Sequence, residues 1–367
     1  MKIENYYKIG DLINPLPIQF ENVQALFKEC FVRVPSRIDT FLCHHNYFAN
    51  PPRRQVYPVG AINFVIDQFT QAKVEVINGD EIILDDEIDR KSIILHTALV
   101  LKKTLGFKEG LKIQAKNLHL IKHGGFGSSA ALQTSVAIAI NNIFGNKIPN
   151  TYLIKLLSQN YGEESDRPGF LSPMASIGGA SASAMLNSNT IIIGGESEIW
   201  KQYNLPKEYK VVIAIPDIKK LPDGILDMEL YQKGFLLFEK LGLEWGHIKE
   251  DILKNKIIYG LNNKDMSSLF ESINMYTIGA FGDIPQYFRH RWLSHSIFMD
   301  EFIHEIYYSI YKEISNKENC FFVSSGGPSI AFITKEATKV KQILNNYPSL
   351  KIFECELYNK GPIIKLN

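Results

Sequence analysis

Hydrophobic and polar positions in the first half of the chain follow two different periods. An alternation of apolar and polar residues, typical of half-buried strands, predicts strands at residues 31–34, 56–66, 72–77 and 111–116. Apolar residues at helical spacing predict helices at residues 22–30, 89–105 and 130–143. Because strands precede helices instead of alternating regularly with them, this order favours an α+β fold over a doubly wound sheet.

The second half of the chain changes from short mixed elements to long helical patterns. Its first part predicts a helix at residues 151–161, a hairpin of strands at 180–186 and 190–193, and a strand at 209–215. Further along, the pattern predicts helices at 226–241, 248–260, 266–276 and 294–314 and strands at 320–323, 330–333 and 351–357. We therefore expect two domains, residues 1–203 and residues 204–367.

Composition narrows the class of protein. A chain of 367 residues is long enough for two medium domains, and 45% apolar with 22% charged residues is ordinary for a soluble globular protein. The formal net charge is +1, and no block of Lys and Arg is longer than a pair. We therefore expect no nucleic-acid partner and no binding to an anionic membrane.

The cysteines and the apolar runs indicate the compartment. The four cysteines are scattered without CxxC spacing, so they predict buried thiols in a reducing environment and neither a disulfide framework nor a zinc cluster. The chain shows no signal-peptide pattern and no apolar run of about 18 residues, the usual length of a membrane span. These features predict a cytoplasmic protein.

A glycine-rich stretch between a predicted strand and a predicted helix is the strongest candidate for chemistry. It contains Gly124, Gly125 and Gly127, followed by Ser128 and Ser129 at the start of the helix. Glycines allow the backbone N–H groups to turn toward a ligand, and the helix start adds unpaired N–H groups and a positive dipole end. The stretch therefore predicts a phosphate site, although a purely structural strand–turn–helix junction has the same appearance. Its spacing is neither GxGxxG nor GxxxxGK[ST].

A second glycine turn lies near the C-terminus, between two predicted strands. It includes Ser325, Gly326 and Gly327, and taken alone it is most simply a hairpin loop. Two glycine turns from different halves of the chain could also meet on one ligand at a domain interface, where pockets are frequent.

A third candidate segment follows the strand at residues 31–34. Arg37 and Asp39 are two residues apart, so they lie on the same face of an extended segment next to Ser36. Arg37 could bind a phosphate or carboxylate of a ligand, or could form a structural ion pair with Asp39. His123 adjoins the first glycine turn and is a further candidate to contact an anion.

The three segments together resemble the GHMP superfamily of galactokinase, homoserine, mevalonate and phosphomevalonate kinases. Residues 34–39 resemble its N-terminal motif, residues 124–131 its phosphate loop, and residues 324–329 its C-terminal glycine motif, in the family order. The resemblance implies a ribosomal S5-like N-terminal domain, with a left-handed βαβ crossover, and a ferredoxin-like C-terminal domain.

The kinases of this superfamily usually carry a catalytic Asp in a segment that is similar to residues 168–179 here. Leu171 takes the place of that Asp, and a leucine cannot accept a proton. One branch, β-ribofuranosylaminobenzene 5′-phosphate synthase, resembles this chain in residues 205–216, in Ser324-Ser325 and in residues 359–361. Its reaction needs no comparable base, because diphosphate leaves phosphoribosyl diphosphate as an aromatic acid attacks and loses CO2. The stretch Ser128-Ser129-Ala130-Ala131 has instead the form found in the kinases.

The main expectation from the sequence is therefore a phosphoribosyl transferase of the synthase type that forms a C–C bond. The alternatives are an ATP-dependent kinase acting on a small molecule and a non-catalytic binding protein of the same fold. The resemblance implies Mg²⁺ as cofactor, a phosphorylated donor and a small acceptor, and leaves a homodimer open. By their chemical types, the candidate catalytic residues are Arg37, Asp39, His123 and Ser129, and Ser129 is also the candidate metal ligand. The residues expected to bind the donor are Ser36, Gly124, Gly125, Gly127, Ser128, Ser129, Ser325, Gly326 and Gly327.

Overall fold

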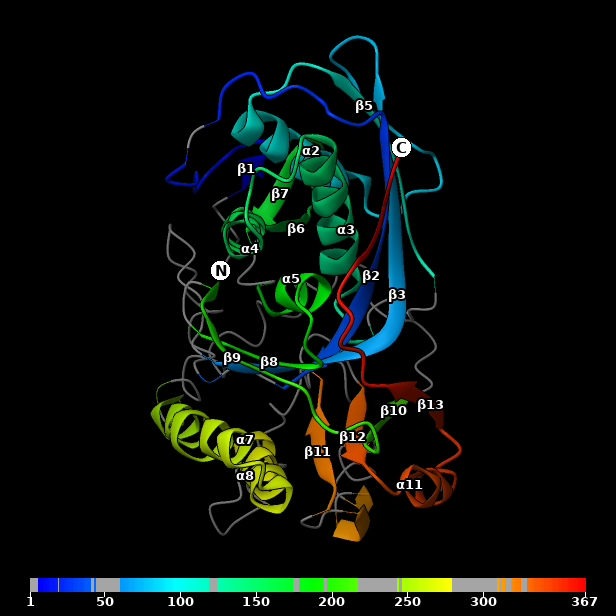
Figure 1. The fold of residues 1–367 in the computed structure, drawn as a ribbon. Coiled ribbons are helices and arrows are strands. Elements are labelled where there is room, and N and C mark those ends of the chain that lie inside the picture. The colour runs from blue at the N-terminus through cyan, green and yellow to red at the C-terminus, as the bar shows by residue number, and fades with distance from the viewer. Residues whose placement is uncertain are drawn as a thin grey trace.

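The computed structural model describes residues 6–18, 20–40, 43, 60–118, 124–173, 178–194, 197–216, 243, 246–278, 309–310, 312–314, 318–324 and 329–367. The expected helix at 226–241 and most of the one at 294–314 lie outside these residues. The described part of the molecule is built on two main sheets, one in each half, and helices pack on each of them (Figure 1). Most strand pairs in these sheets are antiparallel.

The larger sheet belongs to the first domain. Its strands, in spatial order, are β14 (Ile363–Leu366), β2 (Glu29–Asp39), β3 (Ala61–Ile77), β5 (Gly110–Asn117) and β4 (Ile82–Leu84). Two further strands extend it from β3, namely β8 (Thr190–Ile193) and β9 (Ile199–Tyr203). The end of the chain thus returns to pair with β2 of the first domain.

Helices lie on one side of this sheet (Figure 1). They are α2 (Lys91–Leu105), α3 (Ser128–Ile143), α4 (Asn150–Gln159) and α5 (Gly178–Met185). Nearly every residue of α3 is buried, which matches its lack of charged side chains. A small sheet of β1 (Tyr7–Lys8), β7 (Phe170–Pro173) and β6 (Gly162–Glu164), with β7 in the middle, lies beside these helices.

The second domain is built on a four-stranded antiparallel sheet. Its spatial order is β11 (Cys320–Val323), β12 (Ile330–Thr334), β10 (Lys210–Pro216) and β13 (Leu350–Glu356). The helical segments of this half are η2 (Ile252–Ile257), α7 (Ile258–Asn263), α8 (Met266–Ile278) and α11 (Ala337–Leu344). The α+β, two-domain architecture expected from the sequence is confirmed.

Two hydrophobic cores follow from this arrangement, and they meet near the first glycine turn. In the first core, the four helices α2, α3, α4 and α5 pack on the larger sheet. In the second core, α8 and η2 pack on the sheet of the second domain. The second core also takes in Phe64 of β3, whose ring stacks on Phe322 at 5.2 Å between centroids. Phe126, inside the glycine turn, is buried in this second core, whereas Ala130 and Ala131 just after it belong to the first.

Three expectations about elements are wrong. Residues 22–28 form no helix, and the chain is already extended in β2 from Glu29. The strands expected at 56–66 and 72–77 are parts of a single strand over their described residues, because β3 runs without a break through residues 67–71. The segment expected as the first strand of a hairpin, 180–186, forms α5, and β8 instead pairs with β9.

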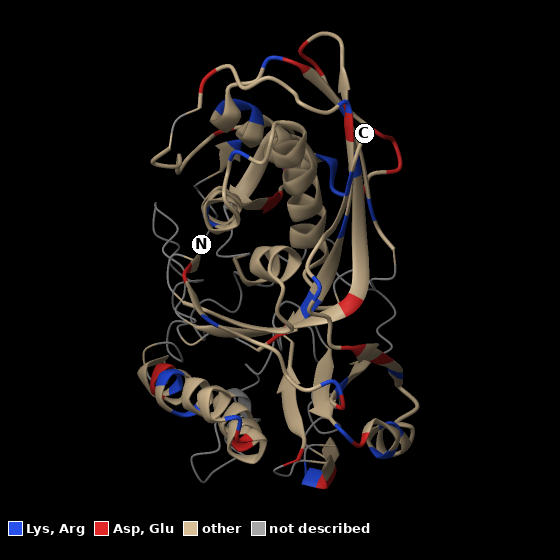
Figure 2. Cartoon of the chain, in the orientation of Figure 1, with Lys and Arg blue, Asp and Glu red and all other residues tan. Residues whose placement is uncertain are grey.

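Residues of both charge signs are distributed along the described parts of both domains, and neither sign gathers in one region of the chain in the view drawn (Figure 2). No helix among the described residues combines the length and the apolar character that crossing a bilayer requires. All four cysteines are free and buried, as expected.

Candidate active site

The first glycine turn leads directly into α3, and its glycines are needed for its shape. Gly125 has φ +87° and Gly127 has φ +69°, both in the left-handed region that side chains disfavour. Gly127 caps α3 without a side-chain hydrogen bond, and the first turn of α3 has no acidic residue. The free N–H groups and the positive end of the helix dipole are therefore available to a bound anion.

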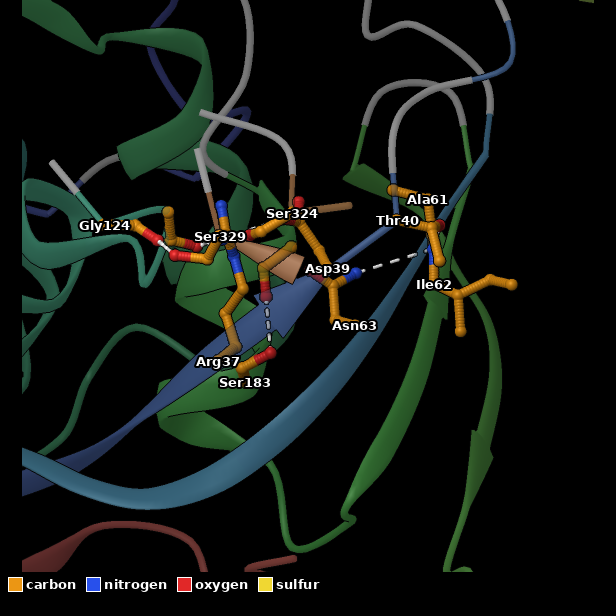
Figure 3. Close-up of polar contacts among 12 residues, drawn as sticks. Arg37, Asp39, Thr40, Ala61, Ile62, Asn63, Gly124, Ser183, Ser324 and Ser329 are labelled. Carbon is orange, nitrogen blue, oxygen red and sulfur yellow. Dashed lines mark hydrogen bonds and ion pairs between the residues drawn. The ribbon is translucent and has the colours of Figure 1, made fainter. Parts of the chain in front are cut away.

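Three side chains hold the carbonyl groups of this turn. Arg37 Nη1 donates to the Gly125 carbonyl at 2.8 Å, Ser324 Oγ donates to the same oxygen at 2.7 Å, and Ser329 Oγ donates to the Gly124 carbonyl. Figure 3 shows these side chains converging from β2 and from the second glycine turn. Arg37, Ser324 and Ser329 thus form a clamp on the turn. In a trans peptide the N–H points opposite to the C=O, so the N–H groups of Gly125 and Phe126 point away from this clamp.

The clamp brings together the flanks of two turns that are about half the chain apart. Ser324 ends the segment after β11 and Ser329 precedes β12, and the Ser324 N–H donates to the Ser329 carbonyl at 2.8 Å. The residues between them, including Ser325, Gly326 and Gly327, lie outside the described residues, as does His123. The contact of Ser324 and Ser329 with the first turn nevertheless places both segments at one location.

Arg37 and Asp39 share one face of β2, as their spacing predicts. Arg37 Nη1 lies 2.8 Å from Asp39 Oδ1, and their side chains are 13% and 7% exposed. The sequence left open whether Arg37 binds a ligand anion or pairs with Asp39. The structure contains the ion pair, and it adds the hydrogen bond from Arg37 to the Gly125 carbonyl. Ser36 is buried, and its hydroxyl forms no hydrogen bond within the described residues.

A buried network behind Ser129 was missed in the sequence. Tyr161 lies near Ser129, the Tyr161 hydroxyl donates to Glu163 Oε2 at 2.8 Å, and Arg90 Nη1 pairs with Glu163 Oε1. Burial first, and then the nearby Glu163 carboxylate, raise the pKa of Tyr161 well above its ordinary value, so the phenol stays protonated. In the sequence Glu163 stands in a polar, breaker-rich stretch, where solvated charges are the usual interpretation.

The residues present fit a magnesium ion only as a partner of the donor's phosphates. Ser129 offers one hard oxygen ligand at the helix start, whereas both oxygens of Glu163 already accept hydrogen bonds. No group of three or more His, Cys, Asp and Glu side chains within the described residues could form a metal cage. Magnesium commonly binds through few protein ligands together with substrate phosphates, and Ser129 suits that mode.

Leu171 is the residue that the sequence resemblance aligns with the catalytic Asp of the kinases. It lies on β7 between β1 and β6, opposite Tyr7 and Glu164, and it is fully buried in the first core. No proton acceptor is therefore present at this position. Asp39 is the carboxylate that the described residues place beside the loop, and it is engaged by Arg37.

The α+β architecture of two domains is that of the GHMP kinase fold. Residues 92–172 match the sequence profile of the GHMP kinases N terminal domain. No relative is found among curated proteins.

Solved structures support the fold over nearly the whole chain. A homoserine kinase from Cytophaga hutchinsonii aligns at 13% identity and TM-score 0.58, covering 93% of this chain and 99% of its own. The Methanococcus jannaschii mevalonate kinase aligns at 14% identity and TM-score 0.53, covering 90% of this chain and 98% of its own. A mevalonate diphosphate decarboxylase from Legionella pneumophila aligns at 14% identity and TM-score 0.56, covering 89% of this chain and 100% of its own. These similarities do not show the synthase branch suggested by the sequence.

Proposed function

We propose that the protein is a magnesium-dependent kinase that transfers the terminal phosphoryl group of ATP to a small-molecule acceptor. One observation carries the proposal. Arg37, Ser324 and Ser329 hold the carbonyls of Gly124 and Gly125 toward the protein. The loop N–H groups and the start of α3 are then left for the phosphates of a donor. The N-terminal family match and the neighbouring kinases support ATP as that donor.

The residues of the site act by positioning and by charge. Phosphoryl transfer requires the donor and acceptor oxygens to be held in line while negative charge on the phosphoryl group is stabilised. The loop N–H groups would stabilise that charge, and a magnesium ion held by Ser129 would neutralise the donor phosphates. Asp39 holds Arg37, and Arg37 holds the loop in shape. With Leu171 buried, the proton of the acceptor passes to solvent or to a phosphate oxygen rather than to a carboxylate at that position.

A second candidate is the phosphoribosyl transfer expected from the sequence. The observation that favours it is Leu171, because departure of diphosphate from phosphoribosyl diphosphate requires charge stabilisation but no base at that position. The same loop would then bind the departing diphosphate. Attack by an aromatic acid on C1 of the ribose would form the C–C bond, and loss of CO2 would restore the aromatic ring.

Ligand-dependent thermal unfolding distinguishes the two donors. A ligand that binds only the folded state raises Tm, by an amount set by its concentration relative to Kd. The unfolding is measured once with Mg²⁺ and ATP and once with Mg²⁺ and phosphoribosyl diphosphate. We expect ATP to stabilise the folded protein by about 3 kcal/mol at a hundredfold excess over Kd, and phosphoribosyl diphosphate not to do so. Stabilisation by phosphoribosyl diphosphate alone would support the second candidate. No stabilisation by either would favour a binding protein of the same fold.

A further inference from the structure

The face of the larger sheet opposite the helices carries a cavity of about 280 Å³. Phe31 on β2, Lys73 on β3 and Gln114 on β5 are register partners and form one row of its floor. Successive side chains of a strand point to opposite faces, and Cys30 and Val32, on either side of Phe31, are buried in the first core. The row that contains Phe31 therefore lies on the outer face of the sheet.

The next row on the same face presents two cations and an amide. Arg33, Gln71 and Lys116 are register partners on β2, β3 and β5, and Gln71 and Lys116 line the cavity. Within the described part of the chain, neither Arg33 nor Lys116 forms an ion pair. Arg33 instead lies over the Phe69 ring, 5.0 Å from its centroid. Because guanidinium and ammonium groups only donate hydrogen bonds, this side of the cavity favours an anionic group of a ligand.

The remaining cation of the floor is already neutralised by its neighbours. Lys73 Nζ lies 2.9 Å from Glu29 Oε2 and also pairs with Glu75 on its own strand. Both carboxylates stand outside the lining of the cavity. Lys116 is therefore the cation that the cavity offers to a ligand.

The segment that follows β4 lines another side of the cavity with carboxylates. Asp85 Oδ2 accepts from Gln114 Nε2 at 2.9 Å, and Asp85 Oδ1 accepts from the Glu87 N–H at 3.0 Å. Glu87 itself forms no ion pair with any described residue. Lys116 lines the same cavity without pairing with Asp85 or Glu87 in the described structure. The carboxylates only accept, so this side favours a cationic group of a ligand.

We propose that the cavity binds a small zwitterion, an α-amino acid with an apolar side chain. The carboxylate of the ligand would contact Lys116 and Gln71, its ammonium group would contact Glu87, and its side chain would pack on the Phe31 ring. A volume of about 280 Å³ is at the lower end of the range for ligand pockets, which suits an amino acid better than a nucleotide. The site is independent of the proposed function, because no residue of the glycine turns lines it.

Isothermal titration calorimetry with three related probes tests the two charged sides separately. L-phenylalanine carries both charges and a ring that can pack on Phe31, whereas phenethylamine lacks the carboxylate and 3-phenylpropionate lacks the ammonium group. We expect L-phenylalanine to bind the wild type roughly fivefold more tightly than either analogue, which is the upper effect of one partly exposed ion pair.

The variants should produce a crossed pattern. Lys116→Gln should weaken binding of L-phenylalanine and 3-phenylpropionate roughly fivefold and leave phenethylamine unchanged. Glu87→Gln should weaken L-phenylalanine and phenethylamine to a similar extent and leave 3-phenylpropionate unchanged. Both side chains are exposed, so both variants should fold.

Two neighbouring charges serve as matched controls. Lys112 lies on the same face of β5 as Lys116, and Asp86 lies beside Glu87 and pairs with Lys91, but neither Lys112 nor Asp86 lines the cavity. Lys112→Gln and Asp86→Asn should therefore leave the affinities for all three probes unchanged.

Absence of L-phenylalanine binding to the wild type at millimolar concentration would overturn the inference. An equal loss of affinity in Lys112→Gln and Lys116→Gln would also overturn it, because binding would then follow net charge and not the cavity. ATP affinity should be the same in Lys116→Gln as in the wild type. Failure of this inference and failure of the proposed function are therefore distinguishable.

Discussion

Gly127 shows how one residue shapes the site. A Cβ at this position would lie 3.2 Å from Ala180 Cβ and 3.4 Å from Arg37 Cζ, at a backbone φ of +69°. Neither the conformation nor the space suits a side chain. Gly79, in the turn between β3 and β4, has φ +93° but nothing within 4 Å of a Cβ. The two glycines therefore share the backbone requirement and differ in their surroundings.

Gly127→Ala should weaken donor binding, whereas Gly79→Ala should not. Both variants should lose about 1–2 kcal/mol of folding free energy from the left-handed backbone alone. Gly127→Ala should lose more, because Arg37 and Ala180 must move. Chemical denaturation gives the stability, and ATP titration with Mg²⁺ gives the affinity. Equal affinities in the two variants would show that the turn does not contact the donor.

His96 gives a pH dependence at the residue scale. The ring is buried, with Nδ1 accepting from the Gly10 N–H at 2.9 Å and Nε2 lying 2.6 Å from the Asn160 carbonyl. Burial, which outweighs the hydrogen bond to Asn160 and the charge of Asp11, lowers the pKa of His96 below its ordinary value of 6.5. Protonation would place a second N–H against that of Gly10.

Because the folded protein binds this proton more weakly than the unfolded chain does, stability is lost as pH falls through 6.5 toward the folded pKa. Unfolding free energy should therefore decrease between pH 7 and pH 5. Carboxylates with a lowered pKa, such as Asp85 and Glu29, change mainly below this range. His96→Gln should be less stable at pH 7 but should show a shallower slope. An unchanged slope would remove His96 as the cause.

At the scale of elements, β7 fixes the environment of Leu171. Leu171 lies on the middle strand of the small sheet, and its side chain is fully buried in the first core. A carboxylate there would be surrounded by apolar groups. Leu171 therefore contributes to the packing of the first core.

Leu171→Asp should accordingly destabilise the protein by at least about 3 kcal/mol and should not increase activity. Leu171→Met, which conserves volume and polarity, should cost less than about 1.5 kcal/mol. Thermal unfolding and turnover of ATP measure the two effects. A gain of turnover in Leu171→Asp would mean that this position faces the reacting groups after all.

Elements with a clear period were predicted from the sequence, and elements without one were not. α3 and β5 carry regular patterns, and both form where expected. α5 is composed largely of glycine, alanine and serine and is buried on nearly every side, so no apolar stripe marks it as a helix. β3 contains the polar stretch Asp67-Gln68, which interrupts the pattern although the pairing with β2 continues past it.

The site was predictable only where its residues form local motifs. The glycine turn and the Arg37–Asp39 pair are recognisable within a few residues, and the structure joins Arg37 to the turn. The buried network of Arg90, Glu163 and Tyr161 is different, because Arg90 and Glu163 lie 73 residues apart and have no spacing that announces their contact. Only the packing of α2 against the small sheet brings them together.

At the scale of the whole molecule, the second of the two hydrophobic cores contains residues of both domains. Phe64 of the first domain stacks on Phe322 of the second, and the Tyr276 hydroxyl donates to the Gly60 carbonyl at 3.0 Å. Phe126 of the glycine turn is buried in the same core. Movement of one domain away from the other would therefore expose apolar surface and disturb the first glycine turn.

The described contacts predict that the two domains unfold in a single cooperative transition. Calorimetric and van't Hoff enthalpies should agree within error. Phe322→Ala should lower the stability by about 3–5 kcal/mol and leave the transition single, because the lost contacts belong to both domains. Two separate transitions in the wild type would contradict a shared core.

Hydrogen exchange in the presence and absence of ATP with Mg²⁺ tests most directly that the glycine turn and the start of α3 bind the donor. The expected result is slower exchange of backbone amides within residues 124–132, where free N–H groups would become hydrogen-bonded to phosphate oxygens. Peptides from β13 and α11 serve as internal controls and should not change. Clear thermal stabilisation by ATP with no change of exchange in residues 124–132 would contradict the proposed site.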